Sequence, residues 1–183
     1  CLLKDMSQNS RKVTFIMILS YISLIVMAEL KTGLQAPKFS LPDKDGNIIS
    51  LNGFKDKWVV LYFYPKDNTP GCTIEAIDFT SSLKEFKKLN AVILGVSPDS
   101  PKSHLNFCNK HNLEVTLLSD QDHKTMENYG VWQLKNLFGI KHHGVVRSTF
   151  LIDPQGKISH IWRKVKVKGH IKEVKEVLIN LKG

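Results

Sequence analysis

The chain has 183 residues, a length that suits one domain with an ordinary hydrophobic core. Its hydrophobic fraction of 42% and charged fraction of 23% are those of a globular protein and exclude a chain dominated by low-complexity disorder. A net charge of +9 is compatible with a nucleic-acid partner, but the lysines are spread along the chain, so we expect none.

The N-terminal part of the sequence differs from the rest. A basic pair precedes an uncharged apolar run, residues 13–28, which is short for a transmembrane helix but typical of a signal peptide. The alternative is upstream translated sequence before a start at Met27. In either case we take residues 1–26 as an N-terminal extension, with Cys1 outside the domain, and residues 27–183 as the domain. We expect a cytoplasmic protein without stable membrane association of the folded domain, or an exported or tethered one if the apolar run is a targeting segment.

The domain alternates apolar strands with amphipathic helices. Strands are predicted by apolar or alternating runs between turn residues, over 38–51 (two short strands around a turn), 58–64, 91–97, 115–120, 144–153 and 157–167. Helices are predicted by helical spacing or capping residues, from Thr69 onward and over 100–112, 122–130 and 170–182. This order predicts an α/β protein of the thioredoxin-like class, with a mixed central sheet flanked by helices.

A single cysteine follows Thr-Pro-Gly in the stretch FYPKDNTPGCT, residues 63–73. Thr69 is suited to cap the next helix with its hydroxyl, and Pro70 is suited to the first helical position. Cys72 then lies in the first turn, where unpaired N–H groups and the helix dipole favour the nucleophilic thiolate. On the local sequence alone, a small apolar residue at a helix start is an equally good interpretation.

These residues resemble a known family. Pro65, Thr69 and Cys72 match the active-site signature of the peroxiredoxins, and YFYPKDNTPGCTIEA resembles their bacterioferritin-comigratory (BCP or PrxQ) subgroup. Further similar stretches, among them GVSPDSPKSH, YGVW and GVVRSTFLIDPQGKI, extend the resemblance over residues 30–183. The resemblance implies a thioredoxin-dependent peroxidase for hydrogen peroxide and organic hydroperoxides, acting in antioxidant defence and redox homeostasis without metal, haem or flavin.

The resemblance also implies roles for single residues. Cys72 would be the peroxidatic cysteine, Thr69 would hydrogen-bond the peroxide, and Pro65 would shield the site from water. Arg147 would stabilise the thiolate and the transferring oxygens, and Glu75 would orient Arg147 through a charge-assisted hydrogen bond. Plainer alternatives are that Thr69 only caps the helix, that Arg147 is a surface strand residue, and that Glu75 is a favourable charge at a helix start.

The sequence departs from the subgroup at the usual position of the resolving cysteine, where Ile77 stands. Cys108, in the predicted helix 100–112, resembles the resolving cysteine of a minority of the subgroup. We expect an intramolecular disulfide with Cys72 after partial unwinding of that helix, because two helix-borne thiols rarely start at disulfide geometry. The alternatives are a buried structural Cys108 and a one-cysteine peroxidase that uses an external thiol.

The partners that we expect are peroxides and thioredoxin or a similar thiol reductant, with a monomeric enzyme. His142 and His143 are predicted in a loop without the carboxylate or thiol partners of a metal site. The surrounding segment 132–144 could shape the pocket mouth or dock a reductase. Competing functions are a basic thioredoxin-like binding protein without peroxidase activity and a thiol–disulfide oxidoreductase, which the absence of a Cys-x-x-Cys pair disfavours.

Overall fold

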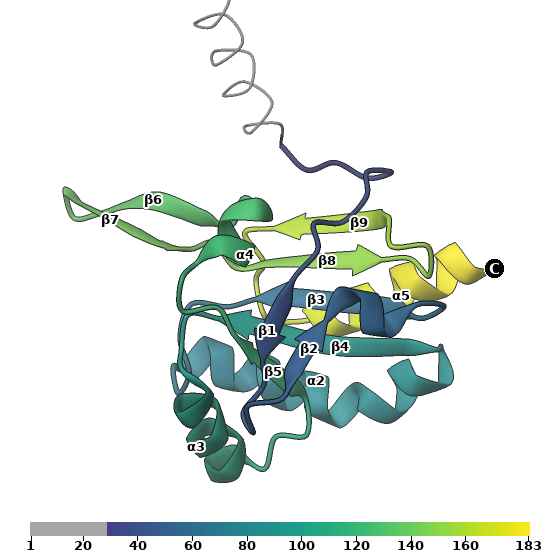
Figure 1. Cartoon of the computed structure of the whole chain (residues 1–183), viewed down its shortest axis with the longest axis horizontal. Coiled ribbons are helices and arrows are strands. Elements are labelled where there is room, and N and C mark those ends of the chain that lie inside the picture. The colour runs from purple at the N-terminus through teal and green to yellow at the C-terminus, as the bar shows by residue number, and fades with distance from the viewer. Residues whose placement is uncertain (1–28) are drawn as a thin grey trace, which may run out of the picture. The chain divides into compact units, whose positions relative to one another are not determined.

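A five-stranded mixed sheet forms the centre of the fold, in the order β5-β4-β3-β8-β9 (Figure 1). The computed structural model describes residues 29–183, so the predictions for residues 1–26 lie outside the described residues. β3, β4 and β5 run parallel, and β8 runs antiparallel to both β3 and β9. The bounds of the five strands are β3 Trp58–Phe63, β4 Ala91–Ser97, β5 Thr116–Ser119, β8 Ser148–Ile152 and β9 Ile158–Arg163.

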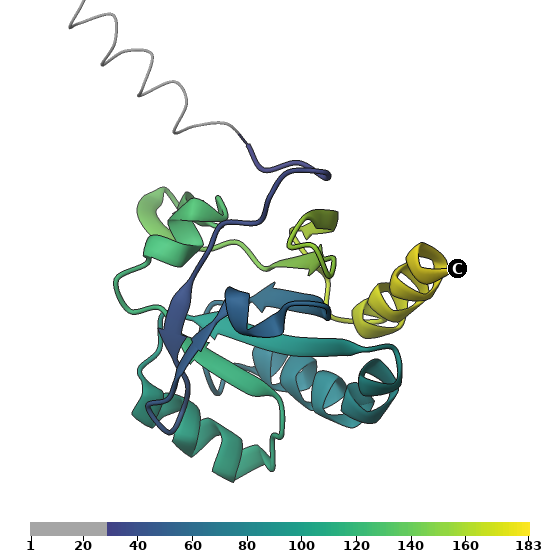
Figure 2. The ribbon, with the colours of Figure 1, turned by 45° about the vertical axis from the view of Figure 1, so that its right-hand side comes forward.

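Helices and a small ribbon cover the sheet. α2 and α5 lie side by side on one face, while the β1–β2 ribbon and the short 3-10 helix η1 lie on the other (Figures 1 and 2). In the described part of the chain, no helix is long and apolar enough to cross a membrane. The predicted α/β class is confirmed. The bounds are β1 Ser40–Pro42, β2 Ile48–Ser50, η1 Leu51–Phe54, α2 Pro70–Lys88, α3 Pro101–His111, α4 Lys124–Asn128 and α5 His170–Lys182.

The central strand β3 is buried on both faces, as its continuous apolar run predicts. Val60, Tyr62 and the following Tyr64 belong to an apolar cluster that includes residues of α2, α3 and α5. Phe63 points to the opposite face and packs edge-on against Phe150, with ring centroids 5.8 Å apart. The end of β3 therefore lies between two cores, which fixes the loop that follows it.

The apolar stripe predicted for α2 is the face that packs on the sheet. Ala76, Phe79 and Phe86 are at most 1% exposed, and Leu83 is partly buried against the same cluster. Burying one such large side chain contributes ~1.5–3 kcal/mol relative to leaving it exposed. Packing along this stripe holds the first turn of α2, with Cys72, at the end of the sheet.

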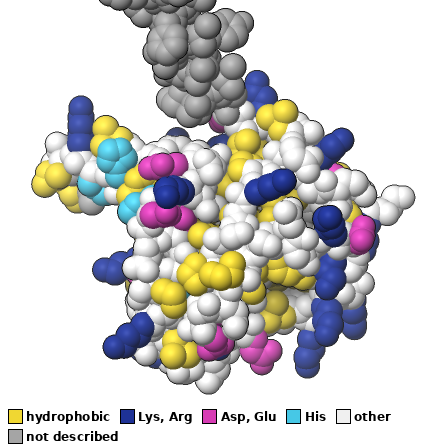
Figure 3. All heavy atoms as spheres, in the orientation of Figure 1, with side chains coloured by type: hydrophobic (Ala, Val, Ile, Leu, Met, Phe, Trp, Pro, Cys, Tyr) yellow, Lys and Arg dark blue, Asp and Glu magenta, His cyan; other side chains and the backbone are white. Residues whose placement is uncertain are grey.

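The segment around the two histidines is a β-hairpin, so its prediction as a loop was wrong. β6 (Trp132–Leu137) pairs antiparallel with β7 (Ile140–Val145), and the hairpin projects from the sheet (Figure 1). Phe138 and Gly139 form the turn with φ of 51° and 82°, the positive values of a two-residue hairpin turn. Hydrophobic and histidine side chains are visible along the hairpin (Figure 3), where Phe138 is 96% exposed.

Two predicted strand boundaries also need correction. The run 144–153 is divided, because its first two residues close the hairpin in β7 and β8 begins only at Ser148. Arg147 consequently lies in the short link between two strands that belong to different sheets. The strand predicted to reach 167 ends at Arg163, and the lysine-rich residues after it form turns and bends.

Candidate active site

Cys72 lies in the first turn of α2, at the carboxyl end of β3. Thr69 is the N-cap residue with an extended backbone, and Pro70 is the first helical residue, as the sequence predicts. The backbone N–H groups of such a first turn have no partner within the helix, so the sulfur lies at the positive end of the dipole. Cys72 is only 2% exposed, and its sulfur is a free thiol.

The hydroxyl of Thr69 does not cap the helix, and this part of the prediction was wrong. It donates instead to the carbonyl oxygen of Lys66 over 2.9 Å. The intervening Asn68 has a φ of 59°, which turns the loop back on itself. Because its hydrogen is directed to Lys66, the oxygen of Thr69 keeps lone pairs with which to accept a hydrogen bond from a substrate.

Arg147 reaches this turn from just before β8, the strand next to β3 in the sheet. β8 pairs with β3 so that Ser148 lies opposite Phe63, which places the preceding Arg147 beside the loop after β3. Its Nη2 donates to the Sγ of Cys72 over 3.1 Å, and its Nη1 donates to the Oε2 of Glu75. The structure therefore brings together three of the predicted residues, with one guanidinium bridging a thiol and a carboxylate.

Glu75 is fully buried beneath Arg147. Burial raises the pKa of Glu75 to about 7, although the charge of Arg147 and its hydrogen bond oppose this rise. Burial also lowers the pKa of Arg147, but Glu75 and Cys72 outweigh that effect, so the net pKa of Arg147 is raised and it stays charged. Among the described residues, Oε1 of Glu75 finds no hydrogen-bond partner. The carboxyl thus has one strong contact, and that contact orients the guanidinium.

The remaining predicted residues lie around this centre. Pro65 is half-buried in the active-site loop, which we define as residues 64–69 between β3 and α2. Ile77, on the same helix as Cys72, is 40% exposed. Cys108 lies in α3 as a free thiol, 4% exposed, and belongs to the same apolar cluster as Cys72. Burial raises the pKa of Cys108, so it is a neutral thiol at neutral pH.

A buried polar network between the active-site loop and α3 was missed by the sequence analysis. Its centre is the carboxylate of Asp67, which accepts hydrogen bonds from Tyr64 (2.7 Å), Ser103 (2.7 Å) and Nδ1 of His104 (2.9 Å). Burial raises the pKa of Asp67, but these bonds outweigh it and hold the pKa below its usual value. Ser103 and His104 are 36 and 37 positions from Asp67 in the sequence, so no local pattern predicts the contact.

The two histidines of the hairpin do not meet a ligand set. Within residues 29–183, no three His, Cys, Asp or Glu side chains are grouped so that they could hold a metal ion. His143 lies near the ring of Trp132 instead, with centroids 6.3 Å apart and planes 15° from parallel. Trp132 in turn stacks on His123 at 3.9 Å. These rings therefore fix the base of the hairpin.

A buried cysteine at a helix N-terminus, paired with an arginine in a thioredoxin-like fold, defines a class of cysteine-based redox enzymes. The AhpC/TSA family profile matches residues 32–161. Peroxiredoxin Bcp of Bacillus subtilis is 50% identical over 149 residues, which cover 81% of this chain and 95% of that protein. Peroxiredoxin Bcp of Escherichia coli is 44% identical over 144 residues, covering 79% and 92%.

A solved structure agrees with these sequence matches. The bacterioferritin comigratory protein of Xanthomonas campestris superposes with a TM-score of 0.79 at 40% identity, covering 84% of this chain and all of that one. The chain belongs to the AhpC/TSA family and, within it, to the Bcp/PrxQ peroxiredoxins. It is therefore a thiol-dependent peroxidase, and the resemblance recognised in the sequence is confirmed.

Proposed function

We propose that Cys72 is the peroxidatic cysteine and that it reduces hydrogen peroxide and organic hydroperoxides. The observation that carries this proposal is the 3.1 Å hydrogen bond from Arg147 to the Sγ of Cys72. A guanidinium at this distance stabilises the thiolate, which is the attacking form, and in our proposal its remaining donors stabilise the negative charge that gathers on the peroxide oxygens. The Xanthomonas campestris relative is described with alkyl peroxide reduction activity, which supports the wider substrate range.

The first chemical step is a displacement at oxygen. The thiolate of Cys72 attacks the terminal peroxide oxygen, the S–O bond forms, and the O–O bond breaks. The leaving oxygen takes up a proton and departs as water or an alcohol, and Cys72 becomes a sulfenic acid. In our proposal, Thr69 accepts a hydrogen bond from the peroxide, Glu75 orients Arg147, and Pro65 keeps water from the sulfur.

For the second step we propose Cys108 as the resolving cysteine. Its sulfur attacks the sulfur of the sulfenic acid, the S–S bond forms, the S–O bond breaks, and water leaves. Two observations support this role: both thiols belong to one apolar cluster, and two mutated cysteines of the Xanthomonas campestris protein have the same spacing in sequence as Cys72 and Cys108. Since both sulfurs are on helices, α3 must partly unwind before they bond.

The recycling partner in this proposal is thioredoxin or a similar dithiol reductant. A disulfide formed at each turnover needs a steady supply of thiols, and the reducing cytoplasm provides one. Because Cys72 and Cys108 belong to the same chain, the cycle needs no residue of a second copy, so we propose that a monomer is the active form.

Intact mass tests this function directly. One equivalent of hydrogen peroxide is added to the fully reduced full-length protein, and the mass is taken within seconds. A loss of about 2 Da that is absent in Cys108→Ser indicates the Cys72–Cys108 disulfide. A gain of about 16 or 32 Da would instead indicate a one-cysteine peroxidase with an external thiol. An unchanged mass, or an equal change in Cys72→Ser, would contradict the role of Cys72.

A further inference from the structure

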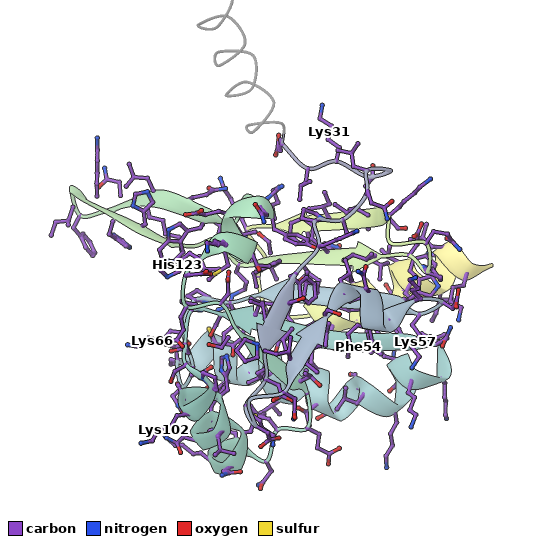
Figure 4. All side chains as sticks on the ribbon, in the orientation of Figure 1. Lys31, Phe54, Lys57, Lys66, Lys102 and His123 are labelled. Atoms are coloured by element: carbon purple, nitrogen blue, oxygen red, sulfur yellow. The ribbon has the colours of Figure 1, made fainter. Side chains whose placement is uncertain are left out.

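Besides one exposed contact, between Nε2 of His111 and Oδ1 of Asn68 over 3.2 Å, the active-site loop and helix α3 are held together by one polar cluster. Two of its members, Tyr64 and Asp67, come from the loop, and the other two, Ser103 and His104, come from the first turn and a half of α3. Figure 4 shows their neighbours Lys66 and Lys102 along the same edge of the molecule. We call these four residues the loop–helix latch. It connects the loop that leads to one reactive sulfur with the helix that carries the other.

The latch is strong on the loop side. The backbone N–H of Asp67 donates to Oδ2 of Asp99 over 2.9 Å, and the same oxygen accepts from the hydroxyl of Ser97 at the end of β4. Asp67 is thus anchored to the sheet as well as to its own loop. When α3 moves, the shortest bonds that must break within the cluster are those that Ser103 and His104 donate to Asp67.

The bond between His104 and Asp67 is also the most deeply buried part of the latch. The side chains of His104 and Asp67 are 0% and 2% exposed. Separating this pair removes one of the three side-chain donors of a buried carboxylate, which is costly until water enters. Cys108 lies four residues after His104, one helical turn further along α3. Unwinding that extends one turn back from Cys108 therefore reaches His104.

The closed latch contains one unfavourable element. Nε2 of His104 is buried and, within the described residues, has no hydrogen-bond partner. An unpaired polar atom of this kind destabilises the closed state, and hydration on opening would remove that penalty. The latch is therefore closed by two bonds from α3 to the Asp67 carboxylate and weakened by one unpaired atom, as suits a contact that opens reversibly.

We propose that the bond from His104 to Asp67 controls how fast Cys108 reaches oxidised Cys72, with His104 as a positioning residue. The inference rests on the proposed function, because Cys108 must be the resolving thiol. The sulfenic acid has two fates. Attack by Cys108 gives the disulfide and water, whereas a second peroxide transfers an oxygen to the sulfur, giving a sulfinic acid while the peroxide becomes water or alcohol. A closed latch favours the second fate.

Two substitutions of His104 test the latch in the full-length protein. His104→Leu removes the donor, whereas His104→Asn keeps an N–H group near the position of Nδ1. After one equivalent of peroxide, we expect disulfide formation to be about tenfold faster in His104→Leu, because one charge-assisted bond no longer holds α3. His104→Asn should stay close to the wild type. At high peroxide, His104→Leu should accumulate less sulfinic acid, while the rate of sulfenic acid formation stays unchanged in both variants.

A control separates the latch from a general loss of stability. Leu178→Ala removes a fully buried side chain from α5 and should lower the unfolding free energy without touching the latch. If Leu178→Ala accelerates disulfide formation as much as His104→Leu does, the latch is overturned. It is also overturned if His104→Leu leaves the disulfide rate unchanged or slows it.

Amide hydrogen exchange of the reduced proteins distinguishes failure of the latch from failure of the proposed function. His104→Leu should exchange faster than the wild type across residues 101–111 and not in β3 or β4. If the wild type forms the disulfide but exchange in His104→Leu is unchanged, the latch is contradicted and the proposed function still stands. Faster exchange in His104→Leu, with no disulfide in the wild type, would contradict the role of Cys108 as resolving cysteine. The control of resolution would then also be wrong, although the bond between His104 and Asp67 would still be shown to hold α3.

Discussion

The guanidinium of Arg147 donates a hydrogen bond to the sulfur of Cys72 over 3.1 Å and holds the buried Glu75 with its other arm. Lysine has one compact charge and cannot make both contacts. We therefore expect Arg147→Lys to lower the second-order rate of peroxide reduction by about 100-fold. Stopped-flow measurement of peroxide reduction by the reduced protein checks this value.

Arg163→Lys is the matched control for that experiment. Arg163 lies on β9 with its guanidinium 5.5 Å from the ring centroid of Phe150, away from the thiol. Its substitution should leave the peroxide rate within twofold of the wild type. A rate within twofold for Arg147→Lys as well would contradict the assignment of Arg147.

The hydroxyl of Thr69 provides a second test of the site. Thr69→Val keeps the shape of the side chain but removes the acceptor proposed for the peroxide and the donor to the Lys66 carbonyl. We expect a peroxide rate about tenfold lower, the equivalent of one hydrogen bond. Thr69→Ser restores the hydroxyl and should recover most of the rate. Equal losses in Thr69→Val and Thr69→Ser would show that the methyl group, not the hydroxyl, is what matters.

Glu75 should make the stability of the protein depend on pH. Its pKa is raised by burial to about 7 from an ordinary value of 4.5. Between these values the folded state holds a proton that the unfolded state releases. The contribution of Glu75 is therefore complete below pH 4.5 and is lost as the pH rises through about 7. In Glu75→Gln this dependence should disappear, a difference on the order of 3 kcal/mol.

Urea unfolding at several pH values across this window measures the effect of Glu75. Glu85→Gln serves as the control, since Glu85 is an exposed residue of the same helix, bound to Lys175. Its substitution should leave the slope of stability with pH between 4.5 and 7 as it is in the wild type. An unchanged slope in Glu75→Gln would mean that Glu75 is already charged throughout this range.

Tyr62 should tolerate the loss of its hydroxyl. This oxygen is buried without a hydrogen-bond partner in the described part of the chain. The ring lies so close to Gly95 that a Cβ atom there would come within 2.5 Å of its Cζ atom. We expect Tyr62→Phe to raise the unfolding free energy by about 1 kcal/mol, because an unpaired polar atom leaves the core. A lower unfolding free energy in urea titrations would show that the hydroxyl is bonded in solution.

The elements of the fold differ in how far local sequence predicts them. Helix α2 could be predicted because Pro70 and the spacing of Ala76, Phe79 and Phe86 are signals within one stretch of chain. The hairpin could not be predicted in this way. Its strands carry exposed apolar and basic side chains, so no alternation of burial marks them, and Phe138 is an unusual residue at a positive φ.

The site shows the same division between local and distant information. The turn that presents Cys72 is local, and the sequence places it correctly apart from the direction of the Thr69 hydroxyl. Arg147 is 75 residues away and enters only because β8 pairs with β3, so the family resemblance was needed to propose it. The bond between Asp67 and His104 could not be predicted, because the two residues are 37 positions apart and no periodic pattern connects them.

The burial of Cys72 links the proposed reaction to the stability of the core. The residue is 2% exposed and belongs to the apolar cluster that includes Phe79 and Phe107. Transfer of an oxygen to this sulfur adds volume and polarity to a packed core, as an overpacking substitution does at a cost of ~1–3 kcal/mol. In the proposed cycle each turnover therefore places a larger and more polar group in the packed core for a short time, so we expect the oxidised protein to be less stable than the reduced protein that bound the peroxide.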